Sequence, residues 1–201
     1  MNSPPRWLWL LAILAALAWW QHAARPLAHA PGVLVPEAPA QGALEARPPD
    51  LHKGVVTIKP LARFSLSARV LSRADYHWDR ESQIAPVDLA LGWGRMSDSA
   101  VLDKVDVSQA GRFYFWHVRE FPIPELEIIE SSANMHLIPA DASIEREIKR
   151  TRAGDIVSFD GYLVESDWPD GGRWISSLTR SDSGAGSCEL IWVENFSIAP
   201  R

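Results

Sequence analysis

The feature that most constrains this chain is an uninterrupted apolar run at its N-terminus. Fourteen residues from Trp7 to Trp20 carry no charge, and tryptophans stand at both ends of the run. As a helix the run rises about 21 Å, which is less than the roughly 30 Å hydrocarbon core of a bilayer. That length fits the apolar region of a signal peptide. Aromatic residues at both ends are instead typical of a segment that stays in the membrane.

Both interpretations carry the rest of the chain across a membrane, and they differ in whether the run is removed. The small residues Ala28 and Ala30 have the spacing of a cleavage site, but Pro31 follows them and the site lies far from the run. We therefore expect residues 1–20 to be an uncleaved signal anchor, a single transmembrane helix. A cleaved signal peptide is the alternative.

The composition changes after the apolar run. Seven of the fifteen prolines lie between residues 21 and 60, alanine is abundant, and aromatic residues are absent. Such a stretch buries too little apolar surface to offset its ordering entropy. We therefore expect residues 21–54 to be an extended linker and residues 55–201 to be the folded domain. A single cysteine excludes an intrachain disulfide framework.

Hydrophobic periodicity predicts a domain of strands with a few short helices. The segment 63–70 alternates strictly, with Phe64, Leu66, Ala68 and Val70 on one face, which indicates a half-buried strand. A second, aromatic strand is expected over residues 112–118. Short helices are expected over residues 97–105, with Ser97 as N-cap, and over residues 142–152, with Asp141 as N-cap.

The C-terminal third predicts an antiparallel meander of segments 155–165, 173–179 and 187–194. Gly161 interrupts the alternation of Val157, Phe159 and Leu163, so we expect the strand to bend there. The fold class is therefore α+β and mainly β: a small, antiparallel, partly open barrel with two or three short helices, preceded by the transmembrane helix.

Two resemblances support this expectation. The segment Gly154–Val164, with its Gly-Asp-x-Val-x-x-x-Gly-Tyr-Leu pattern, resembles strands of OB-like small barrels. More widely, residues 64–194 resemble a group of uncharacterised exported or membrane-anchored bacterial proteins, on the segments 70–76, 86–94, 132–141 and 176–180. That resemblance implies an OB-like domain in the periplasm, held at the inner membrane by a single span, and it assigns no catalytic residue.

The run 131–136 holds the residues best suited to chemistry. Ser132, Asn134 and His136 bring a hydroxyl, an amide and an imidazole together, and residues two apart share a face of an extended chain. They are the candidate catalytic residues. The alternative is that they satisfy backbone groups in a turn and that His136 is structural.

Aromatic residues are the candidates for binding. We expect Trp93, Tyr76 and Trp78 to contribute to a groove, and Trp93 above all, because Gly92 and Gly94 suggest an exposed turn around it. Cys188 is expected to be a buried, inert thiol. No His or Cys pair has metal-ligand spacing, so we expect neither a metal nor another cofactor.

The charge of the folded domain disfavours one class of function. From Leu61 onward the chain has 15 basic and 22 acidic residues. That balance opposes the nucleic-acid binding that an OB-like barrel would otherwise suggest. We expect a membrane-tethered binding or assembly module that meets another envelope protein. The alternative is a small envelope hydrolase with His136 in a polar pocket.

Overall fold

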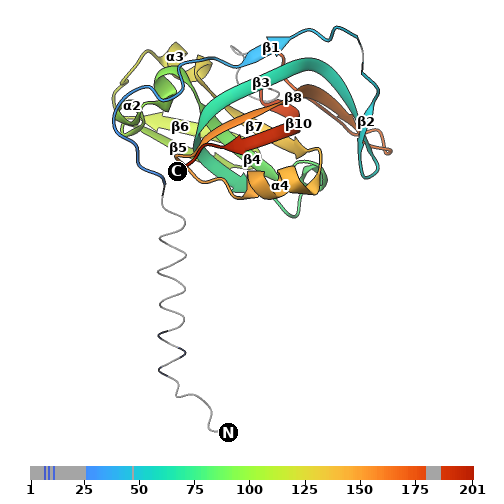
Figure 1. Cartoon of the computed structure of the whole chain (residues 1–201), viewed down its shortest axis with the longest axis horizontal. Coiled ribbons are helices and arrows are strands. Elements are labelled where there is room, and N and C mark those ends of the chain that lie inside the picture. The colour runs from blue at the N-terminus through green and yellow to red at the C-terminus, as the bar shows by residue number, and fades with distance from the viewer. Residues whose placement is uncertain (1–6, 8, 10, 12–25, 47, 180–186) are drawn as a thin grey trace.

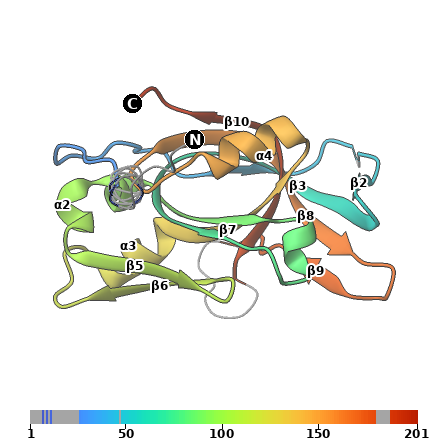
Figure 2. The same cartoon turned by 90° about the horizontal axis from the view of Figure 1, so that it is seen from below.

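The structure, a computed structural model, describes residues 7, 9, 11, 26–46, 48–179 and 187–201. Its centre is an eight-stranded sheet that curls on itself (Figure 1). The strands of this sheet are β1 (Ala40–Gly42), β2 (Leu51–Lys53), β3 (Val56–Asp75), β4 (Val87–Gly92), β7 (Ser132–Pro139), β8 (Ile156–Asp167), β9 (Arg173–Ile175) and β10 (Glu189–Ile198). A separate hairpin of β5 (Val105–Ala110) and β6 (Phe113–Val118) lies beside the sheet (Figure 2).

Five of the strands form a closed ring of pairings. The order is β3, β4, β7, β10, β8 and back to β3, with β7 and β10 parallel and the other ring pairs antiparallel. The helical elements are η1 (Glu81–Gln83), η2 (Gly94–Ser97), α2 (Ser99–Leu102), α3 (Glu125–Glu130) and α4 (Ala142–Lys149). A mainly-β α+β class with short helices is thereby confirmed.

The inside of the ring is an apolar core. Phe64, Leu66, Ala68 and Val70 are all at most 5% exposed, which confirms the alternation predicted for this strand. Side chains of the other ring strands meet them there, among them Leu89, Leu91, Met135, Leu137, Leu163, Ile191 and Val193. Because strand side chains alternate, the neighbouring residues of each strand point to the outside of the ring.

Gly161 allows a close approach between two ring strands. It pairs with Val193 of β10 on one side and with Phe64 of β3 on the other. The register of β10 shifts immediately afterwards, between Val193 and Asn195. A β-carbon on Gly161 would meet the carbonyl oxygen of Trp192 well inside van der Waals contact. The position therefore requires glycine because of the neighbouring backbone.

The helix starts were predicted with mixed success. Asp141 caps α4 by accepting hydrogen bonds from the amides of Ser143 and Ile144, as expected. The N-cap of α2 is Asp98, which accepts from Ala100, so the assignment of Ser97 was wrong. Ser97 ends the short helix η2, and its hydroxyl accepts hydrogen bonds from two backbone amides of residues 34 and 35 instead.

The predicted C-terminal meander was wrong in its last strand. β9 does pair with β8, but it is only three residues long. β10 then pairs with β8 and β7 and has no pairing with β9 among the described residues. Ser176 leaves the sheet after β9, and its hydroxyl accepts a hydrogen bond from the amide of Leu190. The return of β10 to β8 is what closes the ring.

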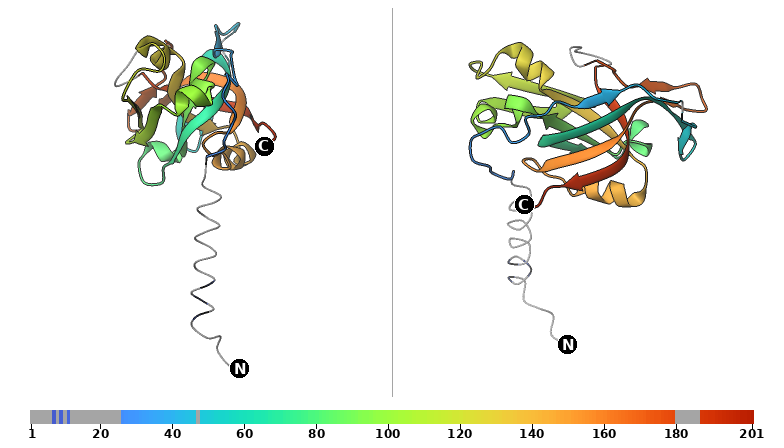
Figure 3. Two further views of the ribbon diagram at one scale, coloured as in Figure 1. Left: turned by 90° about the vertical axis from the view of Figure 1, so that its left-hand side faces the viewer. Right: turned by 45° about the horizontal axis from the view of Figure 1, so that its top comes forward.

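Residues 26–46, which we call the strap, lie along the outside of the domain (Figure 3). The amide of Leu27 donates to the carbonyl of Ala153, and β1 pairs with β3. Val35 is 5% exposed and belongs to the main core. The stretch is extended, as proline content predicted, but it packs on the domain and contributes to its core.

Residues 7–20, the expected anchor, lie mostly outside the described part of the chain. Trp7, Trp9 and Leu11 are the described members, and they are helical and exposed. No helix within the described residues has both the length and the apolar character needed to span a bilayer.

Candidate functional site

The polar row of β7 lies on the outside of the ring. Ser132, Asn134 and His136 share that face, as their spacing predicted, and they are 5%, 2% and 2% exposed. On the adjacent strand Asp88 pairs with His136 in register and is fully buried. The outer face of β4 and β7 is therefore as well covered as the inner face, and polar groups fill it.

Asp88 is the centre of this polar face. Its Oδ1 accepts a hydrogen bond from Arg112 at 2.8 Å. Its Oδ2 lies 2.9 Å from Nδ1 of His136, although the two atoms lack good hydrogen-bond geometry. The ring of Trp174 packs on the imidazole, with centroids 4.6 Å apart. A buried carboxylate thus joins a histidine of the sheet to an arginine of the hairpin.

Arg112 stands at the tip of the β5–β6 hairpin. Gly111 and Arg112 have φ values of 57° and 71°, the left-handed conformation that a two-residue type I′ turn requires. For a residue with a side chain this conformation costs roughly 1–2 kcal/mol. Arg112 is the only described residue other than glycine with a positive φ. The turn directs the guanidinium of Arg112 toward Asp88.

Four further contacts hold the Arg112 side chain. Its Nε and Nη2 donate to the two carboxylate oxygens of Asp79 at 2.7 and 2.9 Å, and Nη1 donates to the carbonyl of Ala85. The guanidinium also stacks 3.8 Å from the centroid of the Tyr76 ring. We call Asp79, Asp88, Arg112 and His136 the clamp, because together they fix the hairpin on the ring.

The charges of the clamp shift the pKa values of Arg112, Asp79 and the neighbouring Tyr76. Burial opposes the charged form of Arg112, but hydrogen bonds to Asp79 and the charge of Asp88 outweigh burial and raise its pKa. Hydrogen bonding to Arg112 lowers the pKa of Asp79. Burial and the nearby charge of Asp88 raise the pKa of Tyr76. The ion pair between Arg112 and Asp79 is therefore fully formed at neutral pH.

The remaining polar residues of β7 also bind the hairpin. Nδ2 of Asn134 donates to the carbonyl of Arg112 at 3.0 Å, and its Oδ1 accepts from Gln109 at 2.7 Å. The hydroxyl of Ser132 is hydrogen-bonded to the phenol of Tyr114 at 2.7 Å. These contacts join Ser132 and Asn134 to the hairpin, and both residues lie in the strand β7 and not in the turn that the structural alternative assumed.

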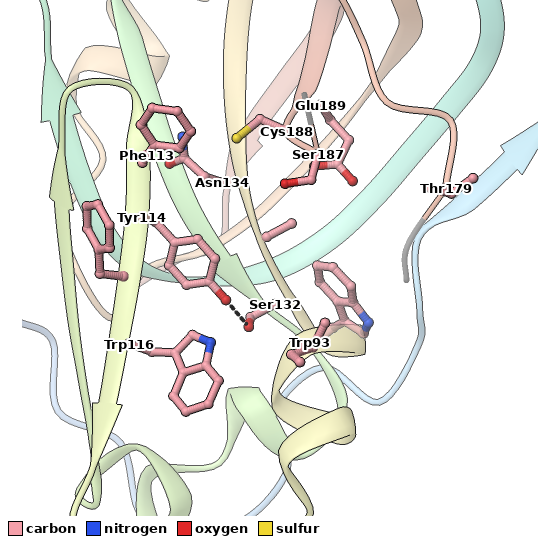
Figure 4. A pocket seen from close by; sticks show the side chains of 13 residues that line it. Trp93, Phe113, Tyr114, Trp116, Ser132, Asn134, Thr179, Ser187, Cys188 and Glu189 are labelled. Atoms are coloured by element: carbon pink, nitrogen blue, oxygen red, sulfur yellow. Dashed lines mark hydrogen bonds between the residues drawn. The ribbon is translucent and has the colours of Figure 1, made fainter. Parts of the chain in front are cut away.

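A cleft of about 380 Å³ opens between β6 and β7 (Figure 4). Tyr114 and Trp116 point into it from the hairpin, opposite Trp93 and Ser132. Burial raises the pKa of Tyr114, and the charge of Glu189 adds to that shift. The other lining residues are Phe113, Phe115, Ile129, Ala133, Asn134, Thr179, Ser187, Cys188 and Glu189. The cleft is therefore aromatic on one wall and mixed polar on the other.

The three predicted binding aromatics do not share a site. Trp93 lines the cleft but is only 3% exposed, so the prediction of an exposed turn was wrong. Gly94 donates its amide to Val35 of the strap, and this contact covers the turn. Tyr76 belongs to the surroundings of the clamp, and Trp78 stands 97% exposed outside the cleft. The strand predicted to be aromatic instead supplies Phe113, Tyr114, Phe115 and Trp116, and all four line the cleft.

His136 has the partner that a catalytic imidazole needs, but it does not line the cleft. An aspartate at Nδ1 is the arrangement that orients a general base. The side chain is only 3% exposed and is sandwiched between Asp88 and Trp174. Cys188 lines the cleft and is partly exposed, so it is less buried than its alternating pattern predicted.

Within the described part of the chain, no three His, Cys, Asp or Glu side chains lie close enough together to hold a metal ion. Searches against protein-family models, curated proteins and solved structures give no match to this chain.

Proposed function

We propose that this protein is a membrane-tethered, extracytoplasmic binding module whose ligand occupies the cleft between β6 and β7. The observation that carries the proposal is the aromatic wall of that cleft. Phe113 and Phe115 are 42% and 53% exposed, and Tyr114 and Trp116 are half-buried beside them. A row of partly exposed aromatic side chains over a concave surface is typical of a recognition site.

The ring supports an OB-like barrel as the scaffold. OB folds are five-stranded, partly open Greek-key barrels, and they bind ligands on the outer face of their second and third strands. The corresponding ring strands here are β4 and β7. Their outer face is filled by the clamp and by the hairpin inserted between them. The binding surface is therefore displaced from the sheet to the cleft at the edge of the hairpin.

The surface charge around the cleft argues against a nucleic acid. The hairpin with its flanking residues and α3 carry five exposed carboxylates, at Asp103, Asp106, Glu120, Glu125 and Glu130. Only Lys104 and Arg119 oppose them in these described segments. A phosphate backbone would be repelled, because nucleic-acid binding depends on clustered basic side chains.

With the proposed anchor, the strap would keep the domain close to the membrane. If residues 7–20 form the anchor, Leu27, which is held against Ala153, follows Trp20 by only about seven positions. Seven residues span at most about 25 Å. The module therefore sits near the bilayer surface, and the 21–54 segment does not hold it at a distance.

Site-specific photo-crosslinking in native membranes tests the proposal. A photoreactive amino acid at Phe115, on the cleft, should give a defined adduct. The matched control is Val55, which is 71% exposed and lies in the turn between β2 and β3. Alkaline phosphatase fused after Arg201 should be active. An inactive phosphatase, or equal adducts at both positions, would refute the proposal.

A small hydrolase is the second candidate, favoured by the Asp88–His136 pair alone. It requires Nε2 of His136 to reach a substrate beside Trp174. Full-length protein would then hydrolyse a chromogenic ester, and His136→Gln would abolish that activity in protein that still unfolds cooperatively. We expect no such activity, because the imidazole is 3% exposed and lies outside the cleft.

A further inference from the structure

We infer that the ligand of the cleft is an extended, cationic polypeptide segment that pairs with the open edge of β6. This inference rests on the proposed function, since it names the partner of the same site.

The first observation is the free edge of β6. In a two-residue hairpin the closing pair, here Ala110 and Phe113, exchanges both hydrogen bonds. The bonds to β5 are therefore made by Phe113, Phe115 and His117. The amides and carbonyls of the alternate residues, 114, 116 and 118, point away from β5.

No strand covers that edge within the described residues. β6 pairs only with β5, and β7 already has β4 and β10 on its two sides. In the same part of the chain, the backbone groups of Tyr114, Trp116 and Val118 make no hydrogen bond to another segment. A row of unpaired donors and acceptors is a template on which another strand can form.

The second observation is that the open edge borders the cleft. Tyr114 and Trp116, whose outward backbone groups form this edge, direct their side chains into the cleft (Figure 4). A segment added beside β6 would place alternate side chains in this cavity. Main-chain bonds would supply affinity, and the pocket would select apolar side chains at every second position.

The third observation is charge. Five exposed carboxylates on the flanks of the hairpin and on α3, at Asp103, Asp106, Glu120, Glu125 and Glu130, make no ion pair among the described residues, and the first three line a second hollow together with Phe121. The ring of Phe121, which is 51% exposed, lies 6.2 Å from the ring of Trp116 in the cleft, and Leu126 of α3 is 59% exposed. A segment that alternates apolar residues with Lys or Arg complements both properties.

Amide hydrogen exchange by NMR tests the inference on the full chain in detergent micelles. The probe is a blocked octapeptide that repeats Lys-Val-Thr-Val. Free protein should show slow amides at 113, 115 and 117 and fast amides at 114, 116 and 118. Saturating peptide should slow the three fast amides at least ~10-fold. Peptides with Glu for Lys, or N-methylated along one edge, should bind at least ~10-fold more weakly.

Two variants distinguish strand pairing at the β6 edge from non-specific binding of the peptide. Val118→Pro removes an outward amide that makes no bond to β5, so proline is tolerated there as on other edge strands. It should weaken peptide binding several-fold, whereas Val118→Thr, which keeps the amide, should not. Equal binding by both variants would overturn the pairing mode.

Three other outcomes would also overturn the inference. Slow exchange at 114, 116 and 118 in free protein at every concentration would mean that the chain covers its own edge. Protection that rises with protein concentration alone would assign the edge to a second copy. Absence of any protection by the peptide, with a Phe115 adduct still formed in membranes, would refute the polypeptide partner and leave the proposed binding function standing.

Discussion

The two faces of the β4–β7 pair are both buried, but by different means. On the inside, Leu89 and Met135 belong to the main apolar core. On the outside, Asp88 and His136 meet the guanidinium of Arg112 and aromatic rings. The inner face is stabilised by removal of apolar surface from water. The stability of the outer face instead depends on each buried charge keeping its ion-pair partner.

The difference separates the scaffold from the proposed binding site. The inner face closes the ring, and any well-fitting apolar set of the same volume would serve it. The outer face determines where the hairpin sits, and the hairpin forms one wall of the cleft. A two-stranded hairpin alone is marginally stable in water, so its position depends on the clamp.

The largest expected effect comes from breaking the clamp. Arg112→Met leaves Asp88 buried without its cation, and removal of one partner from a buried ion pair costs about 3–5 kcal/mol. Urea unfolding followed by tryptophan fluorescence measures the loss. The control is Arg119→Met, an exposed cation just after the same hairpin, which should stay within about 0.5 kcal/mol of the wild type. Equal effects of the two variants would contradict the clamp.

A smaller effect is expected from the inner side of the ring. Gly161→Ala forces a β-carbon against the Trp192 carbonyl and should destabilise the protein by about 1–3 kcal/mol, the range for overpacking. Gly42→Ala is the control, because nothing lies within 4 Å of the position that its methyl group would take. Urea midpoints compare the two. An unchanged midpoint for Gly161→Ala would mean that β8 and β10 do not approach closely.

The strap should contribute less to the stability of the domain than either face of the β4–β7 pair. Ser97 is fully buried, and its hydroxyl accepts the amides of Leu34 and Val35. Ser97→Ala leaves both amides without that acceptor and should cost about 1 kcal/mol, the lower end of the range for a lost acceptor, because the bond to Leu34 is only partly buried. Ser65→Ala, at an exposed position of β3, should be neutral. Thermal melting measures both, and a neutral Ser97→Ala would show that the strap is not held there.

The smallest expected effect is on the stability of the protein at acid pH. Arg112 lowers the pKa of Asp79 in the folded protein. The stability from this pair is therefore complete above the unfolded pKa of about 3.9 and is lost as pH falls below that value. Asp79→Asn should lower stability at neutral pH by about 1 kcal/mol or less and should flatten the loss below about pH 4. A loss that begins well above the unfolded pKa of a carboxyl group would contradict this assignment.

The sequence predicted the inner face of the ring better than the outer one. Alternation identified Phe64 and Leu66 as core residues, and the break at Gly161 identified the close approach. Spacing also placed Asn134 and His136 on one face. It did not identify Asp88 as their neighbour, although a charge inside an apolar strand is a signal of paired burial.

The partner of Asp88 could not be predicted from local sequence. Arg112 comes from an insertion between β4 and β7, and only tertiary structure brings the two together. The strap was missed for another reason. Leu27, Gly32 and Val35 bind the domain through their backbone amides. The proline and alanine content of the strap therefore does not predict these contacts.

The central claim is that the clamp fixes the hairpin, which forms one wall of the proposed binding cleft. Native-state hydrogen exchange of the hairpin tests this claim most directly. In the wild type, the amides of Phe113 and Phe115 should be as protected as that of Leu163 in the ring. In Arg112→Met their protection should fall at least ~10-fold more than that of Leu163. If all three amides lose protection equally, or if the hairpin amides exchange freely in the wild type, the hairpin is not held by the clamp and the account is wrong.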